Sequence, residues 1–172
     1  VFVVFSSLAS VGNINPLLGK VCKAKAAFGN KDEFKQVAQK FDDDDDAFRQ
    51  TLEEIASWGT EIVFATCGDK GVMVYDSVRN KHFHEPAPIV EDVKSSHGAG
   101  DTFAAVVIHY LRQGRDVEWA TKAGVIAAGL RVSGREKEIN EQLLTQLMQN
   151  TAPKNRVKEQ ISSLFHKFTP QH

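Results

Sequence analysis

Residues 98–101 read Gly-Ala-Gly-Asp and stand where an apolar helix is predicted to begin. Glycines let a ligand approach the backbone closely, and the N–H groups at a helix start attract anions. Asp101 suits the first turn because a carboxylate there interacts favourably with the helix dipole. Next to an anion site, a carboxylate can also accept the proton of an attacking hydroxyl, as phosphoryl transfer requires. The stretch is therefore either a glycine-rich turn with an acidic helix start or part of a phosphoryl-transfer site.

A second motif, Thr-Cys-Gly-Asp-Lys-Gly at 66–71, directly follows the apolar stretch Glu-Ile-Val-Phe-Ala. Thr66 supplies a hydroxyl, and Gly68 and Gly71 permit a tight turn near the phosphates of a nucleotide. The same pattern is typical of a plain connection between two strands, because glycines commonly mark turns. Both interpretations remain open on these residues alone.

A third motif, Phe-Gly-Asn-Lys-Asp-Glu-Phe at 28–34, contains an amide and a carboxylate three residues apart. Asn30 is a good helix N-cap, and Glu33 at the third helical position would complete a capping box. That structural role is sufficient by itself. A functional alternative is that Asn30 and Glu33 hold a hydrated Mg²⁺ near phosphates, since Mg²⁺ keeps several waters and takes one or two carboxylates.

The hydrophobic pattern predicts the elements that would position these motifs. In chain order we expect strands at 1–8, 24–28 and 60–66, a hairpin formed by 71–77 and 81–87, and helices at 14–24, 31–41, 47–59, 99–112, 117–132, 139–150 and 153–168. This order is typical of an α/β fold with a mostly parallel sheet. Ligands bind at the carboxyl ends of such strands, where loops lead into helices, and the three motifs lie at such places.

Five consecutive aspartates, residues 42–46, separate two of the expected helices. Adjacent like charges repel, so we expect an exposed loop. An acidic metal cluster is the alternative, although a flexible run fixes no ligand geometry.

Length and composition exclude several classes of protein. The 172 residues fit one domain with a real core, and the formal net charge of −1 gives no reason to expect nucleic acid as the default partner. No apolar run reaches the roughly 18 residues of a membrane span. Two cysteines, Cys22 and Cys67, are too few for a disulfide framework, so we expect a reducing intracellular compartment. The cytoplasm is the first expectation and the mitochondrion the second. Because Val1 already lies in a strand pattern, we expect a longer parent protein.

Together the motifs resemble those of the ribokinase, or pfkB, family of carbohydrate kinases, over most of the chain. Gly-Ala-Gly-Asp-Thr-Phe at 98–103 is similar to the carboxy-terminal signature of that family. The resemblance implies that Asp101 is the catalytic base. It also implies that the backbone of Gly98, Ala99 and Gly100 forms the anion hole for the transferred phosphoryl group.

The other two motifs carry the same resemblance. Asn30 and Glu33 match the N-x-x-E motif, which implies a role in placing Mg²⁺, through water, and phosphate. Thr66, Gly68 and Gly71 match the T-x-G-x-x-G loop, which implies contact with the nucleotide. ATP and Mg²⁺ are the implied cofactors. The segments at 1–10 and 25–34 look most like adenosine kinases.

The chain departs from the family pattern just before the anion hole. Ser95 stands where the family has an aspartate that helps to build a monovalent-cation site, so such a site would lack its charged ligand here. His97 is either a cation near the phosphate or a solvated loop side chain.

The resemblance covers only the carboxy-terminal half of a family member. We expect a ribokinase-like α/β fold, a mostly parallel sheet flanked by helices, without the amino-terminal half and lid. Residues 1–150 would be the carboxy-terminal part of the kinase domain, and 151–172 a basic helical tail. Such a sheet exposes an edge, which another chain or the missing half would cover.

Two functions fit these features. The first is ATP-dependent phosphoryl transfer to a hydroxyl of a small alcohol, a sugar or a nucleoside. The second is a catalytically idle, kinase-derived structural subunit of a larger assembly that contains RNA, such as a ribosome or an organelle complex. The tail at 151–172 would then contact the RNA. No feature of the sequence points to a membrane partner.

Overall fold

The computed structural model describes residues 1–4, 23–40 and 44–150. The chain forms two compact units: the sheet unit, Val1–Glu85, and the helical unit, Pro86–His172. Among the described helices, none has the length and apolar character needed to cross a membrane. The helices predicted at 14–24 and 153–168 lie mostly or wholly outside the described residues.

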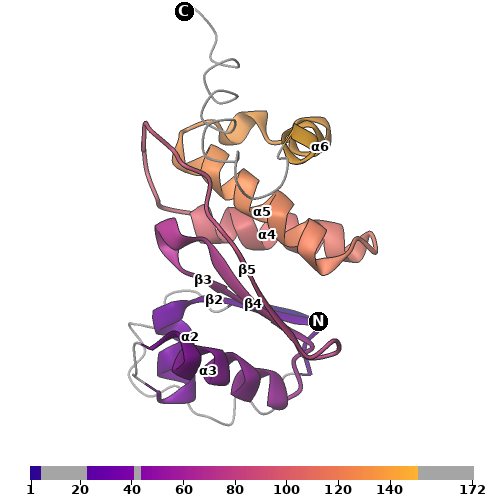
Figure 1. The fold of residues 1–172 in the computed structure, drawn as a ribbon. Coiled ribbons are helices and arrows are strands. Elements are labelled where there is room, and N and C mark those ends of the chain that lie inside the picture. The colour runs from indigo at the N-terminus through magenta and orange to yellow at the C-terminus, as the bar shows by residue number, and fades with distance from the viewer. Residues whose placement is uncertain (5–22, 41–43, 151–172) are drawn as a thin grey trace, which may run out of the picture. The chain divides into compact units, whose positions relative to one another are not determined.

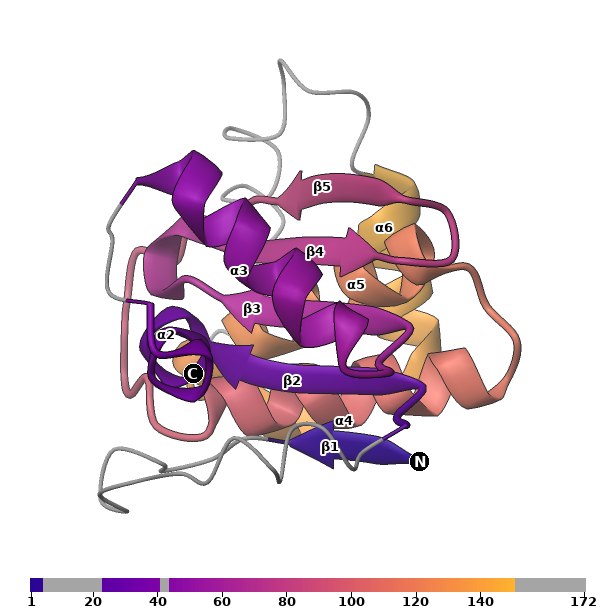
Figure 2. The same cartoon turned by 90° about the horizontal axis from the view of Figure 1, so that it is seen from below.

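The sheet unit is built on five strands in the spatial order β1-β2-β3-β4-β5. They are β1 (Phe2–Val4), β2 (Ala26–Asn30), β3 (Ile62–Thr66), β4 (Val72–Asp76) and β5 (Lys81–Glu85). The β1–β2 and β2–β3 pairs are parallel, and the β3–β4 and β4–β5 pairs are antiparallel, so that β4 alone opposes the others (Figure 2). The mostly parallel sheet and the predicted hairpin are both confirmed.

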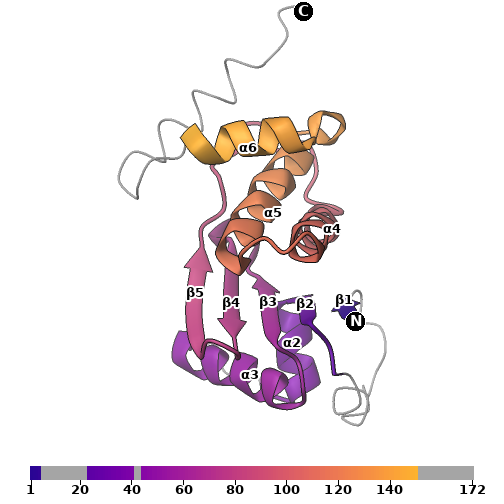
Figure 3. The same ribbon diagram turned by 90° about the vertical axis from the view of Figure 1, so that its right-hand side faces the viewer.

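Two amphipathic helices pack against this sheet, α2 (Lys31–Ala38) on β2 and β3 and α3 (Asp45–Ser57) on β3 and β4 (Figure 3). Their apolar faces and the facing strand residues form one buried cluster. It consists of Ala27, Phe34, Phe48, Leu52, Ile55, Ala56, Val63, Ala65 and Tyr75. Burial of this cluster, more than intrinsic helix propensity, holds such short helices in place.

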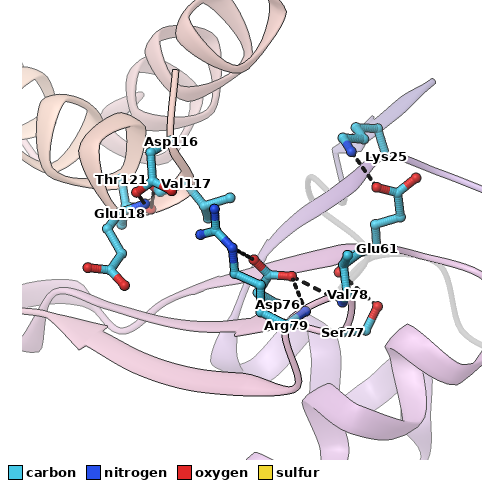
Figure 4. A network of polar contacts seen from close by, with 10 residues as sticks. All are labelled: Lys25, Glu61, Asp76, Ser77, Val78, Arg79, Asp116, Val117, Glu118 and Thr121. Carbon is cyan, nitrogen blue, oxygen red and sulfur yellow. Dashed lines mark hydrogen bonds and ion pairs between the residues drawn. The ribbon is translucent and has the colours of Figure 1, made fainter. Parts of the chain in front are cut away.

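The turn between β4 and β5 is organised by a buried carboxylate. Asp76 accepts hydrogen bonds from the backbone N–H groups of Val78 and Arg79, both at 3.1 Å (Figure 4). These bonds satisfy the carboxylate in place of water, which makes its burial tolerable.

The aspartate run differs from the expected loop. Asp44 is the N-cap of α3 and accepts hydrogen bonds from the N–H groups of Asp46 and Ala47, both at 3.1 Å. Asp45 and Asp46 lie in the first turn, where the helix dipole offsets their mutual repulsion. The helix therefore begins two residues earlier than predicted, although these side chains are exposed as expected.

Other boundaries of the sheet unit also differ from the predicted ones, including those of β2 and α2. β2 runs to Asn30 rather than ending at 28, because its last residues pair with β3. Helix α2 ends at Ala38, and Gln39 follows in the left-handed conformation, with φ of 55°.

The helical unit contains α4 (Ala99–Arg112), α5 (Val117–Val132) and α6 (Glu141–Asn150) (Figure 1). The first two match their predicted bounds, and the third begins two residues later than predicted. α4 and α5 approach closely at Gly124, where a Cβ atom would lie 2.6 Å from Cγ2 of Val107. The segment that leads into α4 is held on the end of α5, because the N–H groups of Lys94 and Ser95 both donate to the Val132 carbonyl, at 2.9 and 3.3 Å.

Candidate functional site

Two of the three motifs lie side by side at the carboxyl ends of neighbouring parallel strands. Asn30 ends β2, Thr66 ends β3, and the two residues are register partners. The Thr66 hydroxyl donates to the Gly29 carbonyl at 3.4 Å. The pairing of β2 with β3 thus brings the Asn30–Glu33 motif next to the turn at 66–71.

Asn30 and Glu33 form a reciprocal pair of hydrogen bonds at the start of α2. The Glu33 N–H donates to Oδ1 of Asn30 at 2.8 Å, and the Asn30 N–H donates to Oε2 of Glu33 at 2.7 Å. The predicted capping box is therefore confirmed. Gly29 leaves room for it, since a Cβ atom there would lie 3.3 Å from Oε2 of Glu33 and 3.2 Å from the Phe34 ring.

The motif at 66–71 folds into a single 3₁₀ turn, Gly68–Lys70, between the antiparallel strands β3 and β4. Its two glycines adopt positive φ, 61° at Gly68 and 99° at Gly71, which other residues adopt only with strain. The Cys67 N–H donates to the Gly71 carbonyl at 2.7 Å and closes the turn. Nothing lies within 4 Å of a Cβ placed on Gly68, so its backbone is open to a ligand.

Two side chains define the surroundings of this turn. His84 of β5 donates from Nε2 to the Lys70 carbonyl at 2.7 Å, since a carbonyl oxygen can only accept. Burial raises the pKa of the Cys67 thiol, so the thiol stays protonated at neutral pH and is a poor nucleophile. No sequence pattern indicated His84, because its contact with the Lys70 carbonyl depends on the strand register that pairs His84 with Met73.

The third motif forms the start of α4 in the helical unit. Gly98 is the N-cap residue, with φ of 77° and no side chain to cap the helix. Its carbonyl accepts hydrogen bonds from the N–H and the hydroxyl of Thr102, at 3.0 and 2.9 Å. The Ala99 N–H donates to the Ser96 carbonyl at 3.2 Å. The other first-turn N–H groups have no intrahelical partner. A Cβ on Gly100 would meet nothing within 4 Å. Asp101, in the same turn, is exposed.

The residues beside this helix start include one that sequence reasoning missed. The Ser95 hydroxyl accepts a hydrogen bond from the His97 N–H at 3.2 Å and thereby stabilises the turn before α4. His97 itself is exposed. Arg131, in the last turn of α5, lies beside Gly98: a Cβ on Gly98 would be 3.5 Å from its Nε atom. The sequence places residue 131 on a helix but cannot show that it meets the Gly98 turn.

The model of the pfkB family of carbohydrate kinases matches residues 15–142. A 5-dehydro-2-deoxygluconokinase of Photobacterium profundum is 32% identical over 109 residues, which cover 62% of this chain and 31% of that protein.

Two solved structures show the fold class. The ribokinase of Thermotoga maritima has a TM-score of 0.67 and 21% identity, covering 87% of this chain and 48% of its own. The Arabidopsis thaliana ribokinase complexed with ribose and ATP has a TM-score of 0.70 and 17% identity, covering 88% and 47%. The fold is therefore ribokinase-like α/β, and the chain spans less than half the length of each of these three proteins.

Proposed function

The chain belongs to the pfkB family of carbohydrate kinases, and on that premise we propose that it transfers the γ-phosphoryl group of ATP to a hydroxyl of a sugar or nucleoside. The observation that carries the proposal is the start of α4. There Gly98 replaces a capping side chain, and an exposed carboxylate, Asp101, follows in the first turn.

In the proposed reaction Asp101 is the base. The acceptor oxygen forms a bond to the γ-phosphorus while the bond from that phosphorus to the bridging oxygen breaks. The hydroxyl proton passes to the Asp101 carboxylate, and ADP leaves with the electron pair of the broken bond. Asp101 is exposed, so an acceptor hydroxyl can reach it, as a general base requires.

The backbone at Gly98, Ala99 and Gly100 would hold the negative charge of the transferred group. First-turn N–H groups point along the helix axis and carry its partial positive charge. The absence of a side chain at Gly98 and the open space at Gly100 let phosphoryl oxygens reach these groups. Preorganised donors of this kind stabilise a transition state without having to reorient during the reaction.

The nucleotide contacts would come from the turn at 66–71. Nothing lies within 4 Å of a Cβ placed on Gly68, so a nucleotide can approach the backbone of the turn there. The Thr66 hydroxyl, only partly buried, would add one side-chain hydrogen bond. The family's structural neighbours include a ribokinase complexed with ATP, which supports a nucleotide as the donor.

Asn30 and Glu33 are the candidate residues for Mg²⁺. The described residues contain no cluster of three or more His, Cys, Asp or Glu side chains that could hold a metal. A carboxylate accepts up to about four hydrogen bonds, however, so the capping box leaves Glu33 able to bind water of a hydrated ion. The pair thus fits Mg²⁺ held through water, and the ion would neutralise charge on the phosphate oxygens.

Finer features of the proposal concern the acceptor and the partners. Adenosine is one candidate acceptor, from the likeness of the segments at 1–10 and 25–34 to adenosine kinases. Because Ser95 carries no charge where the family has an aspartate, we expect no charged monovalent-cation site. The edge strand β1 would pair with further polypeptide, either the amino-terminal half or another chain.

The test is phosphoryl transfer by the natural full-length protein from MgATP to ribose, 5-dehydro-2-deoxygluconate and adenosine. Asp101→Asn should lower turnover by about 10²–10⁴, because it removes the base, and leave ATP affinity nearly unchanged. Asp46→Asn is the matched control, since Asp46 is also an exposed aspartate in the first turn of a helix. An Asp101→Asn protein with normal turnover would refute the mechanism. A folded wild-type protein that phosphorylates none of these acceptors would favour the alternative, an idle structural subunit.

A further inference from the structure

Arg131 lies against the turn that precedes α4. A Cβ atom built on Gly98 would be 3.5 Å from Nε of Arg131 and 3.8 Å from Nη2. The backbone fixes this approach, because the N–H groups of Lys94 and Ser95 donate to the carbonyl of Val132, the residue next to Arg131. The guanidinium therefore stands beside the Gly98 backbone, on the segment that leads into α4.

The hydrogen-bonding capacity of this guanidinium is largely unused by the described residues. Its ion-pair partner is Glu136, with Nη1 and Oε2 3.8 Å apart, which is longer than a hydrogen bond. A guanidinium offers five N–H donors in a planar fork. Only 27% of the side chain is exposed, so water reaches the group incompletely. A partly buried cation with so few partners is stabilised when an anion binds it.

The local charges favour an anion at this position. The start of α4 carries partial positive charge, so in the absence of a ligand it repels a neighbouring guanidinium. An anion between them is attracted to both. The segment 94–97, Lys-Ser-Ser-His, contributes no carboxylate that would compete for Arg131, and Lys94 is paired with Asp92 at 2.7 Å.

We propose that Arg131 is a further phosphate-binding residue, which hydrogen-bonds the phosphoryl group held at the Gly98–Gly100 backbone. The inference rests on the proposed phosphoryl transfer and adds a residue to it. Charge spreads over the equatorial oxygens of the transferred group in the transition state, and a planar guanidinium can bind two such oxygens at once. Its contribution is therefore expected mainly in turnover.

The experiment compares Arg131→Ala, Arg131→Gln and Arg131→Lys in the full-length protein with saturating MgATP and acceptor. The first two should lower kcat at least about tenfold with a smaller change in the KM for ATP, because the lost contact strengthens in the transition state. Lysine should restore part of the rate, since it keeps the charge but not the fork. Added guanidinium ion should raise the rate of Arg131→Ala but not of the wild type. Arg112→Ala is the control: it removes an exposed arginine from the far end of α4.

The outcomes separate this inference from the proposed function. If the wild type is active and the Arg131 variants, checked to be folded by thermal unfolding, match its kcat, the inference is wrong and the kinase function stands. If the wild type is inactive, the same proteins are melted with inorganic phosphate and with chloride at equal ionic strength. Stabilisation by phosphate that is lost in Arg131→Gln supports the anion contact without the kinase. If phosphate changes the melting temperatures of the wild type and of Arg131→Gln equally, the inference is wrong.

Discussion

The helices α2 and α4 differ in how their first backbone N–H groups are treated: side chains cap them at α2 but not at α4. Every helix begins with N–H groups that have no partner within the helix. At α2, the Asn30 side chain and Glu33 satisfy each other's backbone N–H groups. At α4, Gly98 has no side chain to offer, and its left-handed φ of 77° turns the chain into the helix without a cap.

The remaining described α-helices resemble α2 rather than α4. Asp44 caps α3, Asp116 caps α5, and Asn140 accepts a hydrogen bond from the N–H of Leu143 at the start of α6. A glycine in place of a capping side chain costs only a few tenths of a kcal/mol. A helix start without a capping side chain is thus inexpensive for stability. At α4 the Ala99 N–H is bonded to the Ser96 carbonyl, and the N–H groups that follow it have no side-chain cap, so a ligand can bind them.

Among changes to the helix starts that keep Asp101, giving α4 a side chain at its N-cap should have the largest effect. In Gly98→Asn the new residue tolerates positive φ. Its side chain, however, would cover backbone that is now open, with its Cβ atom 3.5 Å from Nε of Arg131. We expect turnover to fall about a hundredfold or more, as when an anion-hole donor is lost, with the fold retained. Initial-rate kinetics and thermal unfolding measure the two effects.

Gly114→Asn is the matched control for that variant. Gly114 follows the other end of α4, has nearly the same φ of 78°, and meets nothing within 4 Å of its Cβ position. Its turnover should equal that of the wild type. If both variants behave alike, the difference between the two ends of α4 has no bearing on function.

The start of α2 allows a change that separates capping from metal binding. Glutamine can replace glutamate in a capping box, so Glu33→Gln should change the free energy of unfolding by less than about 0.5 kcal/mol. The loss of a carboxylate near a hydrated ion should raise the Mg²⁺ concentration for half-maximal rate about tenfold. A magnesium titration of the rate checks this. An unchanged titration would leave Glu33 as a cap alone.

Local sequence patterns predicted most elements of the fold. The ends of the helices at 99–112 and 117–132 were correct because Gly98, Gly114 and Asp116 mark them chemically. The capping box was also readable, since it involves residues three apart. The aspartate run was partly misjudged, because repulsion within 42–46 was weighed without the helix that Asp44 caps.

Contacts between distant residues were not predictable in the same way. Arg131 lies beside Gly98 because the end of α5 meets the segment that precedes α4, where the N–H groups of Lys94 and Ser95 donate to the Val132 carbonyl. His84 reaches the turn at 66–71 only through the register of β4 and β5. Hydrophobic periodicity fixes which face of an element is buried but not which distant side chain lies opposite.

The smallest effect is expected where capping serves structure alone. Asp44→Ala removes the side chain that accepts two N–H groups at the start of α3, so the free energy of unfolding should fall by about 1 kcal/mol. Asp116→Ala should do the same at α5, where one such bond is lost. Both proteins should keep wild-type kcat and KM below their melting temperatures. A cap variant that lost turnover while still folded would show that these starts also serve the site, and the contrast with α4 would fail.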